Sequence, residues 1–306
     1  MTNLKKTLLV ILGPTAVGKT ELCIRLAQHF DTEIVSADSR QFYREMAIGT
    51  AKPTPEEQAE APHHFIDSHS ISQSYNVGDY ENDALACLEE IFSRKNFAIL
   101  TSGSGLYLQV VTEGMDDIPE VDLQVRERLM QQVANHGLES VLPQLEALDP
   151  TFYAQVDRAN PHRVVRALEV CLSTGKPFSS FRKKTKAERP FDILKIGLNR
   201  DREELYERIN ERVDIMVAKG LLEEVKGLYD YKGHQALQTV GYKEIFDYMD
   251  GQYDWEEAIR LLKRNTRHYA KRQMTWFRRD AEIHWFSPKE LEEIVMWIEE
   301  KVQKVE

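Results

Sequence analysis

A glycine-rich segment that could bind phosphate groups lies near the start of the sequence, directly after the apolar run at residues 8–12. It has the form G-x-x-x-x-G-K-[ST] and consists of Gly13, Pro14, Thr15, Ala16, Val17, Gly18, Lys19 and Thr20. Backbone N–H groups of such a loop form a nest for anions, and the helix after it adds the positive end of its dipole. Lys19 would reach terminal phosphates, and the Thr20 hydroxyl would bind Mg²⁺. The spacing predicts a phosphorylated ligand.

A carboxylate follows the second predicted strand, at residues 33–36. Asp38 lies in the segment Ser36-Ala37-Asp38-Ser39-Arg40-Gln41. At the carboxyl end of a strand it could contact the water shell of Mg²⁺, act as a general base, or serve as the N-cap of the next helix. Its position alone leaves these three roles open.

Two motifs of nucleotide hydrolases are missing. The strand expected at residues 97–101 ends in Thr-Ser-Gly-Ser, without the Asp that usually supports Mg²⁺ in these enzymes, and no Asn-Lys-x-Asp motif occurs. Both absences argue against a GTPase and against an ATP-hydrolysing motor.

The elements that must position these residues alternate between strand and helix. Strands at 8–12, 33–36 and 97–101, with helices at 21–30 and 78–93, predict the α/β class: a P-loop NTPase-like parallel sheet with helices on both faces. Ligands of such sheets collect at the carboxyl ends of the strands. The segments 13–20, 37–41 and 102–105 should therefore converge.

A helical section interrupts this core. Helices are expected at 121–135, 137–148 and 160–173, followed by a charged loop at 181–190. A strand at 192–198 then resumes the core, and long helices run to the end. The predicted domains are a catalytic core at 1–114 and 191–306 and an all-helical insertion at 115–190.

Charge is segregated along the chain, although the net charge is −10. Residues 258–279 hold eight Lys or Arg and no acid, and residues 158–195 hold ten against three acids. Two basic patches suggest a local polyanion site, although solvated helix faces remain an alternative. On a helix expected at 255–279, one face carries Arg260, Arg264, Arg267 and Lys271. Trp276 and Phe277 favour core packing individually, although such aromatics can stack on bases.

Composition describes an ordinary globular protein, with 306 residues, 42% hydrophobic and 29% charged. Its three scattered cysteines form no C-x-x-C pair, which fits a reducing cytosol better than a disulfide framework or zinc site. No apolar stretch approaches the ~18 residues of a membrane span. A cytoplasmic protein without a membrane partner is expected.

Seven segments together resemble the motifs of the tRNA dimethylallyltransferases, in order and over nearly the whole chain. They are the loop at 13–20, Ser-Ala-Asp-Ser at 36–39, Ile-Gly-Thr-Ala-Lys-Pro at 48–53, His-His-Phe-Ile-Asp at 63–67, Asn-Pro-His-Arg-Val-Val-Arg-Ala-Leu-Glu-Val at 160–170, Val-Gly-Tyr at 240–242, and Lys-Arg-Gln-Met-Thr-Trp at 271–276. The later motifs are much more specific than a phosphate loop.

The resemblance implies transfer of a dimethylallyl group from dimethylallyl diphosphate to N6 of the adenosine just 3′ of the anticodon (adenosine-37) of a tRNA. The loop would hold the diphosphate of the donor with Mg²⁺, and Asp38 would be the base. Arg212 looks like a second cation for the diphosphate, and a helix-surface ion pair is the alternative. The resemblance assigns tRNA contacts to Asp38, Ser39, Arg40, Gln41 and Ser104 in the core, and to Arg126, His162, Arg163, Val164, Val165 and Arg166 in the insertion.

One motif departs from the family pattern. The usual Gly-Gly-Thr-Gly-Leu-Tyr is Ser-Gly-Ser-Gly-Leu-Tyr at 102–107. Ser104 keeps the hydroxyl of the family's RNA-contacting Thr, whereas Ser102 replaces a glycine that could need an unusual backbone angle. Donor or tRNA preference could change as a result.

Two rival functions make different predictions. A small-molecule or nucleotide kinase with the same core predicts ATP turnover but leaves the basic patches unexplained. A non-enzymatic RNA-binding protein with a vestigial loop predicts RNA affinity that does not depend on Lys19. A monomer is the expected state.

Overall fold

The computed structural model describes residues 5–119, 121–182 and 185–303, and the chain divides into two compact units. The first unit comprises Met1–Thr112 and Glu188–Glu306, and the second comprises Glu113–Ala187. The sequence placed the insertion at 115–190, within three residues of these bounds at each end.

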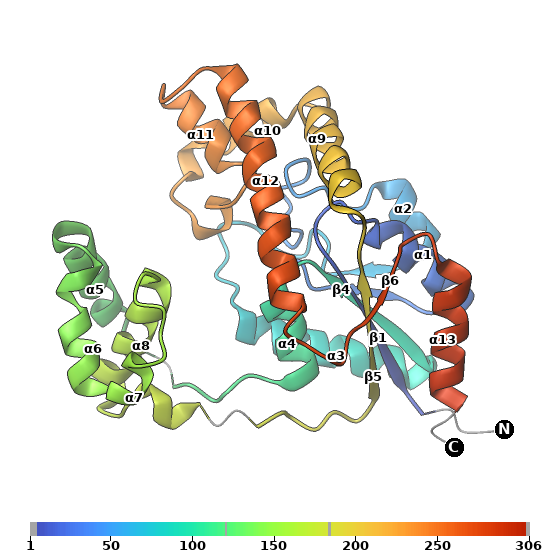
Figure 1. The fold of residues 1–306 in the computed structure, drawn as a ribbon, viewed down its shortest axis with the longest axis horizontal. Coiled ribbons are helices and arrows are strands. Elements are labelled where there is room, and N and C mark those ends of the chain that lie inside the picture. Colours follow the sequence, from blue (N-terminus) through green and yellow to red (C-terminus); the bar gives the residue numbers. More distant parts are fainter. Residues whose placement is uncertain (1–4, 120, 183–184, 304–306) are drawn as a thin grey trace. The chain divides into compact units, whose positions relative to one another are not determined.

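A six-stranded parallel sheet forms the centre of the first unit (Figure 1). Its strands stand in the order β3-β2-β4-β1-β5-β6. In chain order they are β1 (Thr7–Leu12), β2 (Ile34–Ser36), β3 (His63–His64), β4 (Phe97–Ser102), β5 (Asp192–Leu198) and β6 (His284–Phe286). In the centre of the sheet, Leu9 of β1 pairs with Ile99 of β4 and Leu194 of β5. The predicted α/β class with a parallel sheet is confirmed.

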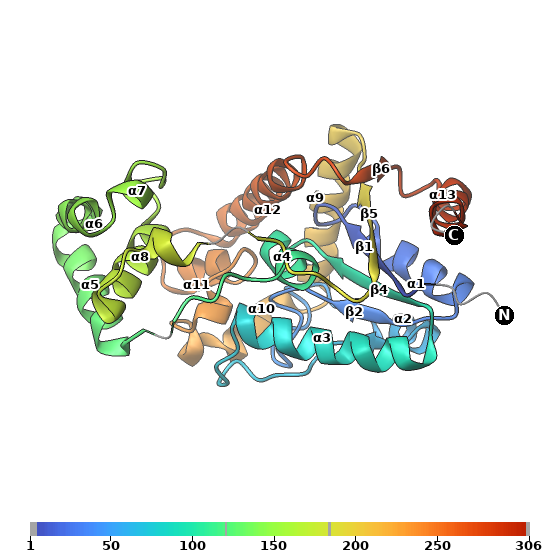
Figure 2. The same cartoon turned by 90° about the horizontal axis from the view of Figure 1, so that it is seen from below.

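Helices cover both faces of the sheet, because successive side chains of β1 point to opposite sides. Leu8, Val10 and Leu12 pack with α3 (Val77–Arg94) and α4 (Gly105–Glu113). Leu9 and Ile11 pack with α1 (Lys19–His29), α9 (Arg202–Ala218) and α13 (Leu291–Gln303). Figure 2 shows α3 along one side of the strands and α1 and α13 on the other.

The expectation of long helices after β5 is only partly right. Between α9 and the 23-residue α12 (Trp255–Phe277) the chain forms only short elements, and β6 separates α12 from α13. The short elements are α10 (Leu221–Gly227), η3 (Tyr229–Tyr231), η4 (Gln235–Leu237) and α11 (Lys243–Met249). The two-residue β3, the three-residue β6 and α2 (Pro55–Glu60) are also absent from the expected elements. Strands this short carry no alternation of apolar and polar residues that a sequence could reveal.

The second unit is helical in its described residues and has its own core. Its elements are α5 (Leu123–His136), η1 (Leu138–Ser140), α6 (Leu142–Leu148), α7 (Pro150–Tyr153), α8 (Pro161–Thr174) and η2 (Phe178–Phe181). The Asn160 side chain caps α8 by accepting from the Arg163 N–H at 3.2 Å, and Gly175 ends the helix in the left-handed region. Leu129, Leu145 and Leu168 lie in the core. Lys183 and Lys184 of the predicted charged loop lie outside the described residues.

Candidate functional site

The loops that follow β1, β2 and β4 converge on one cavity of about 520 Å³. Residues 15–20 of the glycine-rich loop line it, together with Asp38, Gln41, Ser102 and Gly103. The convergence predicted from the parallel sheet is confirmed, since all three segments leave the carboxyl ends of neighbouring strands.

The glycine-rich loop uses glycine where no other residue fits. Gly18 has φ 113° and Gly13 has φ 154°, and a Cβ on Gly13 would lie 2.8 Å from the Leu198 carbonyl oxygen. Ala16 holds a positive φ of 64°, a strain of about 1–3 kcal/mol for a residue with a side chain. The surrounding structure therefore holds this loop in a strained conformation.

Lys19 extends along the inside of the loop. Its ammonium donates to the carbonyl oxygens of Gly13 and Pro14, each at 2.9 Å. The pKa of Lys19 is lowered to about 8, chiefly by burial and also by the charge of the nearby Arg212, although the negative charge of Asp38 opposes both effects. The lysine sits in a site that disfavours uncompensated positive charge, which an anionic ligand would stabilise.

Three arginines contact the glycine-rich loop. Arg208 and Arg212 lie on α9, and Arg200 lies just before that helix. Arg200 donates to the Val17 carbonyl at 2.7 Å, and Arg208 donates to the Ala16 carbonyl at 2.9 Å. Arg212 donates to the Thr15 hydroxyl at 3.2 Å, and burial lowers its pKa. Arg212 is therefore a half-buried cation that lines the cavity beside the loop, rather than a member of a helix-surface ion pair. Arg200 and Arg208 were missed, since only the fold brings α9 to the loop.

Asp38 lines the same cavity as the half-buried Lys19 and Arg212, and its charge raises the pKa of both cations against the effect of burial. Its Oδ1 accepts from the Arg40 N–H at 3.0 Å. Residues 38–54 contain no helix, so the interpretation of Asp38 as a helix N-cap is wrong. The carboxylate lines the cavity and is available for chemistry there.

The residues after Asp38 connect neighbouring loops. The Gln41 side chain donates to the carbonyls of Thr50 and Ala51 at 3.2 and 3.3 Å. The Ser39 and Ser104 hydroxyls lie 3.4 Å apart, and Arg40 donates to the Ser39 carbonyl at 3.4 Å. Ser102 donates to the Ala37 carbonyl at 2.7 Å. The serine found at the position of the family glycine thus joins the β4 loop to the Asp38 loop.

An apolar lobe of about 100 Å³ adjoins the polar cavity. Thr15, Asp38 and Arg212 line both spaces. Five apolar side chains line this lobe, together with Arg40, Tyr269 and several threonines and glycines: Ile209, Val213, Met216, Val240 and Leu262. A cationic phosphate loop, a carboxylate and a small apolar lobe therefore meet within one site.

Relatives of known name are similar in sequence to this chain over almost their whole length. A family model described as IPP transferase matches residues 41–280. The tRNA dimethylallyltransferase of Christiangramia forsetii is 52% identical, covering 96% of this chain and 98% of that protein. The tRNA dimethylallyltransferase 1 of Bacteroides fragilis is 48% identical, covering 97% and 99%. The chain belongs to the tRNA dimethylallyltransferase family.

Solved structures agree with this membership. A tRNA isopentenylpyrophosphate transferase of Bacillus halodurans has a TM-score of 0.72 at 41% identity and covers 98% of each chain. A eukaryotic dimethylallyltransferase, described in the act of modifying tRNA, has a TM-score of 0.77 at 28% identity and covers 94% of this chain and 75% of its own. Membership in a family of prenyltransferases decides against the kinase and the non-enzymatic RNA-binding protein.

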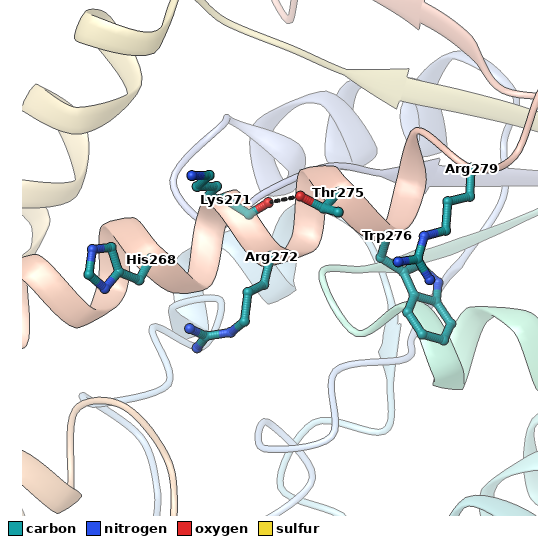
Figure 3. Close-up of a pocket in the computed structure, with 6 residues that line it drawn as sticks. All are labelled: His268, Lys271, Arg272, Thr275, Trp276 and Arg279. Carbon is teal, nitrogen blue, oxygen red and sulfur yellow. Dashed lines mark hydrogen bonds between the residues drawn. The ribbon is translucent and has the colours of Figure 1, made fainter. Parts of the chain in front are cut away.

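In this tRNA dimethylallyltransferase family member, α12 carries a basic stripe near its C-terminal end. We define the stripe as His268, Arg272, Trp276 and Arg279, which with Lys271 and Thr275 line a shallow cavity of about 480 Å³. Figure 3 shows Arg272 and Trp276 projecting from the same side of the helix. Trp276 is 36% exposed, so the prediction that it packs in the core is only partly right, whereas Phe277 is buried.

Part of the basic face predicted for α12 interacts with other side chains of the protein. Arg260 pairs with Glu257 at 2.6 Å, and Arg267 donates to Asn210 at 2.6 Å. Arg267 also lies over the ring of Tyr206. Arg264 and Lys271 remain exposed.

The predicted tRNA contacts of the second unit lie on α5 and α8. Arg126 and Arg166 flank the buried carboxylate of Glu169, at 3.8 and 2.7 Å. His162 and Arg163 are exposed at the start of α8. Val164 and Val165 must be corrected, because both side chains are buried in the core of this unit and cannot meet an RNA surface. Their apolar character within the helix predicted at 160–173 was the signal for burial, because the apolar residues of an amphipathic helix face the core.

No helix among the described residues is both long and apolar enough to span a bilayer.

Proposed function

We propose that this chain transfers the dimethylallyl group of dimethylallyl diphosphate to N6 of the adenosine 3′ of a tRNA anticodon, and releases diphosphate. The supporting observation is that Asp38 shares one cavity with the glycine-rich loop and two half-buried cations, Lys19 and Arg212. This arrangement supports a base for the acceptor amine beside a site for the leaving group.

The loop binds the diphosphate through its backbone N–H groups, and Lys19 and Arg212 balance its charge. The pKa of Lys19 in the ligand-free site is already lowered by burial, so an anion there restores the stability of its charged form. Dimethylallyl carbons occupy the apolar lobe lined by Ile209, Val213 and Met216.

The donor set of this site fits Mg²⁺, because the Thr20 hydroxyl and the Asp38 carboxylate line the same cavity and Mg²⁺ prefers oxygen ligands. When bound, Mg²⁺ would neutralise negative charge on the diphosphate oxygens. Thr20 would bind the ion directly. Asp38 would lie near the ion and keep a carboxylate oxygen facing the acceptor.

The transfer balances with the residues at hand. The allylic C–O bond breaks and its electron pair leaves on the diphosphate, where Lys19 and Arg212 stabilise the added charge. The lone pair of N6 forms the new C–N bond, and the proton that the amine loses goes to a carboxylate oxygen of Asp38. An adenosine flipped out of the anticodon loop presents N6 to this carboxylate.

RNA binding is assigned to the basic stripe of α12 and to Arg163 and its neighbours on α8. Cationic side chains bind phosphates, and the partly exposed Trp276 offers a surface for an unpaired base. We also propose that the chain acts as a monomer in the cytoplasm. Its tRNA substrate occurs there, and the reducing conditions of that compartment keep its cysteines free.

One assay tests the proposal. The protein is incubated with unmodified tRNA, Mg²⁺ and labelled dimethylallyl diphosphate, and the RNA is digested to nucleosides. We expect label in N6-dimethylallyladenosine, none when Mg²⁺ is removed by chelation, and no dependence on ATP. Product formation that requires stoichiometric ATP hydrolysis would overturn the proposal.

A further inference from the structure

Gln273 of α12 joins the phosphate loop to the loop after β4. Its side-chain oxygen accepts from the Thr15 N–H at 2.9 Å, and its side-chain nitrogen donates to the Gly103 carbonyl at 2.8 Å. The residue is 6% exposed. Because both ends of the amide are engaged, Gln273 fixes the distance between α12 and each of these two loops.

The seat of α12 on the β4–α4 loop is tight. A Cβ on Gly103 would lie 2.2 Å from the Gln273 amide nitrogen, and a Cβ on Gly105 would lie 2.2 Å from the Trp276 indole nitrogen. Neither glycine has a positive φ, so close approach of α12 is what these positions require. A movement of α12 would therefore be transmitted to the loops through direct contact.

The same two turns of α12 present different chemistry on their two sides. The basic stripe faces outward, with Arg272 and Trp276 projecting from one side of α12 (Figure 3). Gln273, which follows Arg272 in sequence, is buried. Thr15 receives both the Gln273 contact at its N–H and the Arg212 contact at its hydroxyl. Thr15 thus connects Gln273 of α12 to Arg212, a cation of the proposed diphosphate site. A change in the orientation of α12 would therefore affect Thr15 directly.

We propose that Gln273 is a positioning residue that couples RNA binding on α12 to diphosphate binding in the glycine-rich loop. RNA that holds the stripe fixes α12, and Gln273 then holds the Thr15 N–H and the loop in the conformation that receives diphosphate. Coupling between two sites is reciprocal, so diphosphate raises the affinity for RNA by the same factor. This inference rests on the proposed function, because it takes the stripe as an RNA site.

The test measures the Kd of inorganic diphosphate with Mg²⁺, with and without a saturating anticodon stem-loop RNA. In the unaltered protein we expect RNA to tighten diphosphate binding by about 5–150-fold, the usual range for coupled sites. In Gln273→Met, which keeps the length and loses both hydrogen bonds, the factor should fall towards one. Gln273→Glu keeps an acceptor for the Thr15 N–H and should therefore retain part of the coupling factor. The negative charge that it adds acts on the diphosphate Kd with and without RNA, so its effect cancels in the ratio of the two values.

A matched control is Gln28→Met on α1, where the amide donates to the Glu60 carbonyl at 3.3 Å and lies on the surface. It should leave the factor unchanged. If Gln273→Met fails to fold, Gln273→Asn replaces it, since the shorter amide cannot span both loops.

Kinetics separate coupling from a merely structural role. Loss of positioning should raise the KM for the donor at saturating tRNA while the Kd for RNA alone stays within threefold of the unaltered value. An unchanged coupling factor in a folded Gln273→Met protein that still prenylates tRNA overturns this inference alone. Failure of the unaltered protein to prenylate tRNA overturns the proposed function and the inference with it.

Discussion

At the scale of single residues, the site holds one carboxylate near two half-buried cations. Asp38 lies close enough to Lys19 and Arg212 to raise the pKa of each. In the proposed reaction this carboxylate must stay ionised to accept a proton, and it must not neutralise the cations that would receive diphosphate. Bound diphosphate and Mg²⁺ would change the balance of charge between Asp38 and the two cations. Asp38 and Lys19 are therefore best tested by separate substitutions.

Asp38→Asn should abolish transfer while both substrates still bind. The amide keeps the size of the side chain but cannot accept the proton from N6, and loss of general base catalysis costs about 10²–10⁴-fold in rate. Single-turnover prenylation with saturating tRNA and donor measures this loss. A rate near that of the unaltered protein would show that Asp38 is not the base.

The pKa of Lys19 predicts a decline in donor capture at alkaline pH. Burial lowers this pKa to about 8, so the free protein loses the lysine charge as pH rises through 8 rather than above 10. Because kcat/KM reports the free enzyme, its value for the donor should fall up to tenfold per pH unit above that point. Lys19→Arg, which stays charged, should flatten the decline. A profile that stays level to pH 9.5 in the unaltered protein would contradict the assignment.

At the scale of elements, α12 contributes residues to three parts of the site. It supplies Gln273 to the phosphate loop, Tyr269 to the cavity and the stripe to the surface. Burial raises the pKa of Tyr269 to about 12, so this tyrosine stays protonated and can donate a hydrogen bond. The fit of α12 against Gly103 and Gly105 is therefore part of the site.

Gly105→Ala should destabilise the protein by about 1–3 kcal/mol, because its Cβ would overlap the Trp276 indole and overpacking has this cost. Trp276→Ala removes the obstacle, so the double variant should be less destabilised than the sum of the two single variants. Urea denaturation of the four proteins measures the cycle. Additive changes in the free energy of unfolding would show that the two residues do not contact each other.

The arginines of α8 have unequal tasks. Arg166 pairs at 2.7 Å with Glu169, whose side chain is 1% exposed, whereas Arg163 is exposed beside it. Arg166→Ala should lower the free energy of unfolding by about 1–3 kcal/mol, since it leaves a buried carboxylate short of a partner. Arg163→Ala should change it by less than about 0.5 kcal/mol. Equal effects in urea denaturation would mean that the pair with Glu169 contributes nothing.

At the scale of the whole molecule, an acidic protein with a net charge of −10 carries separate basic surfaces. Some basic residues of these surfaces interact within the protein, such as Arg260 with Glu257 and Arg267 with Asn210. Exposed arginines such as Arg163 and Arg272 are those expected to meet RNA phosphates. Local charge, rather than net charge, governs such binding.

Salt dependence tests this assignment. Arg163→Ala and Arg272→Ala should each weaken tRNA binding and reduce the slope of log affinity against log salt by about 0.7–0.9, the value for one phosphate contact. The donor KM should stay the same. Arg25→Ala on α1, where the arginine pairs with Glu21, serves as the control. Unaltered slopes for Arg163→Ala and Arg272→Ala would return these surfaces to ordinary solvated helix faces.

The sequence by itself determined the features that depend on neighbours along the chain. The glycine-rich loop, the position of Asp38 after a strand and the alternation that predicts a parallel sheet all follow from residue types and periodicity along the chain. Local propensity and periodicity suffice for these, because backbone geometry sets them before the chain packs.

Only the tertiary structure decided which side chains meet across the chain. The contacts of Gln273 with Thr15, of Arg200 with Val17 and of Arg208 with Ala16 join residues separated by 258, 183 and 192 positions. Packing also buried Val164 and Val165 and paired Arg166 with Glu169 within one motif. Residue types and spacing leave such partners undetermined, because a hydrogen bond or a buried contact depends on distances that exist only after the elements pack together.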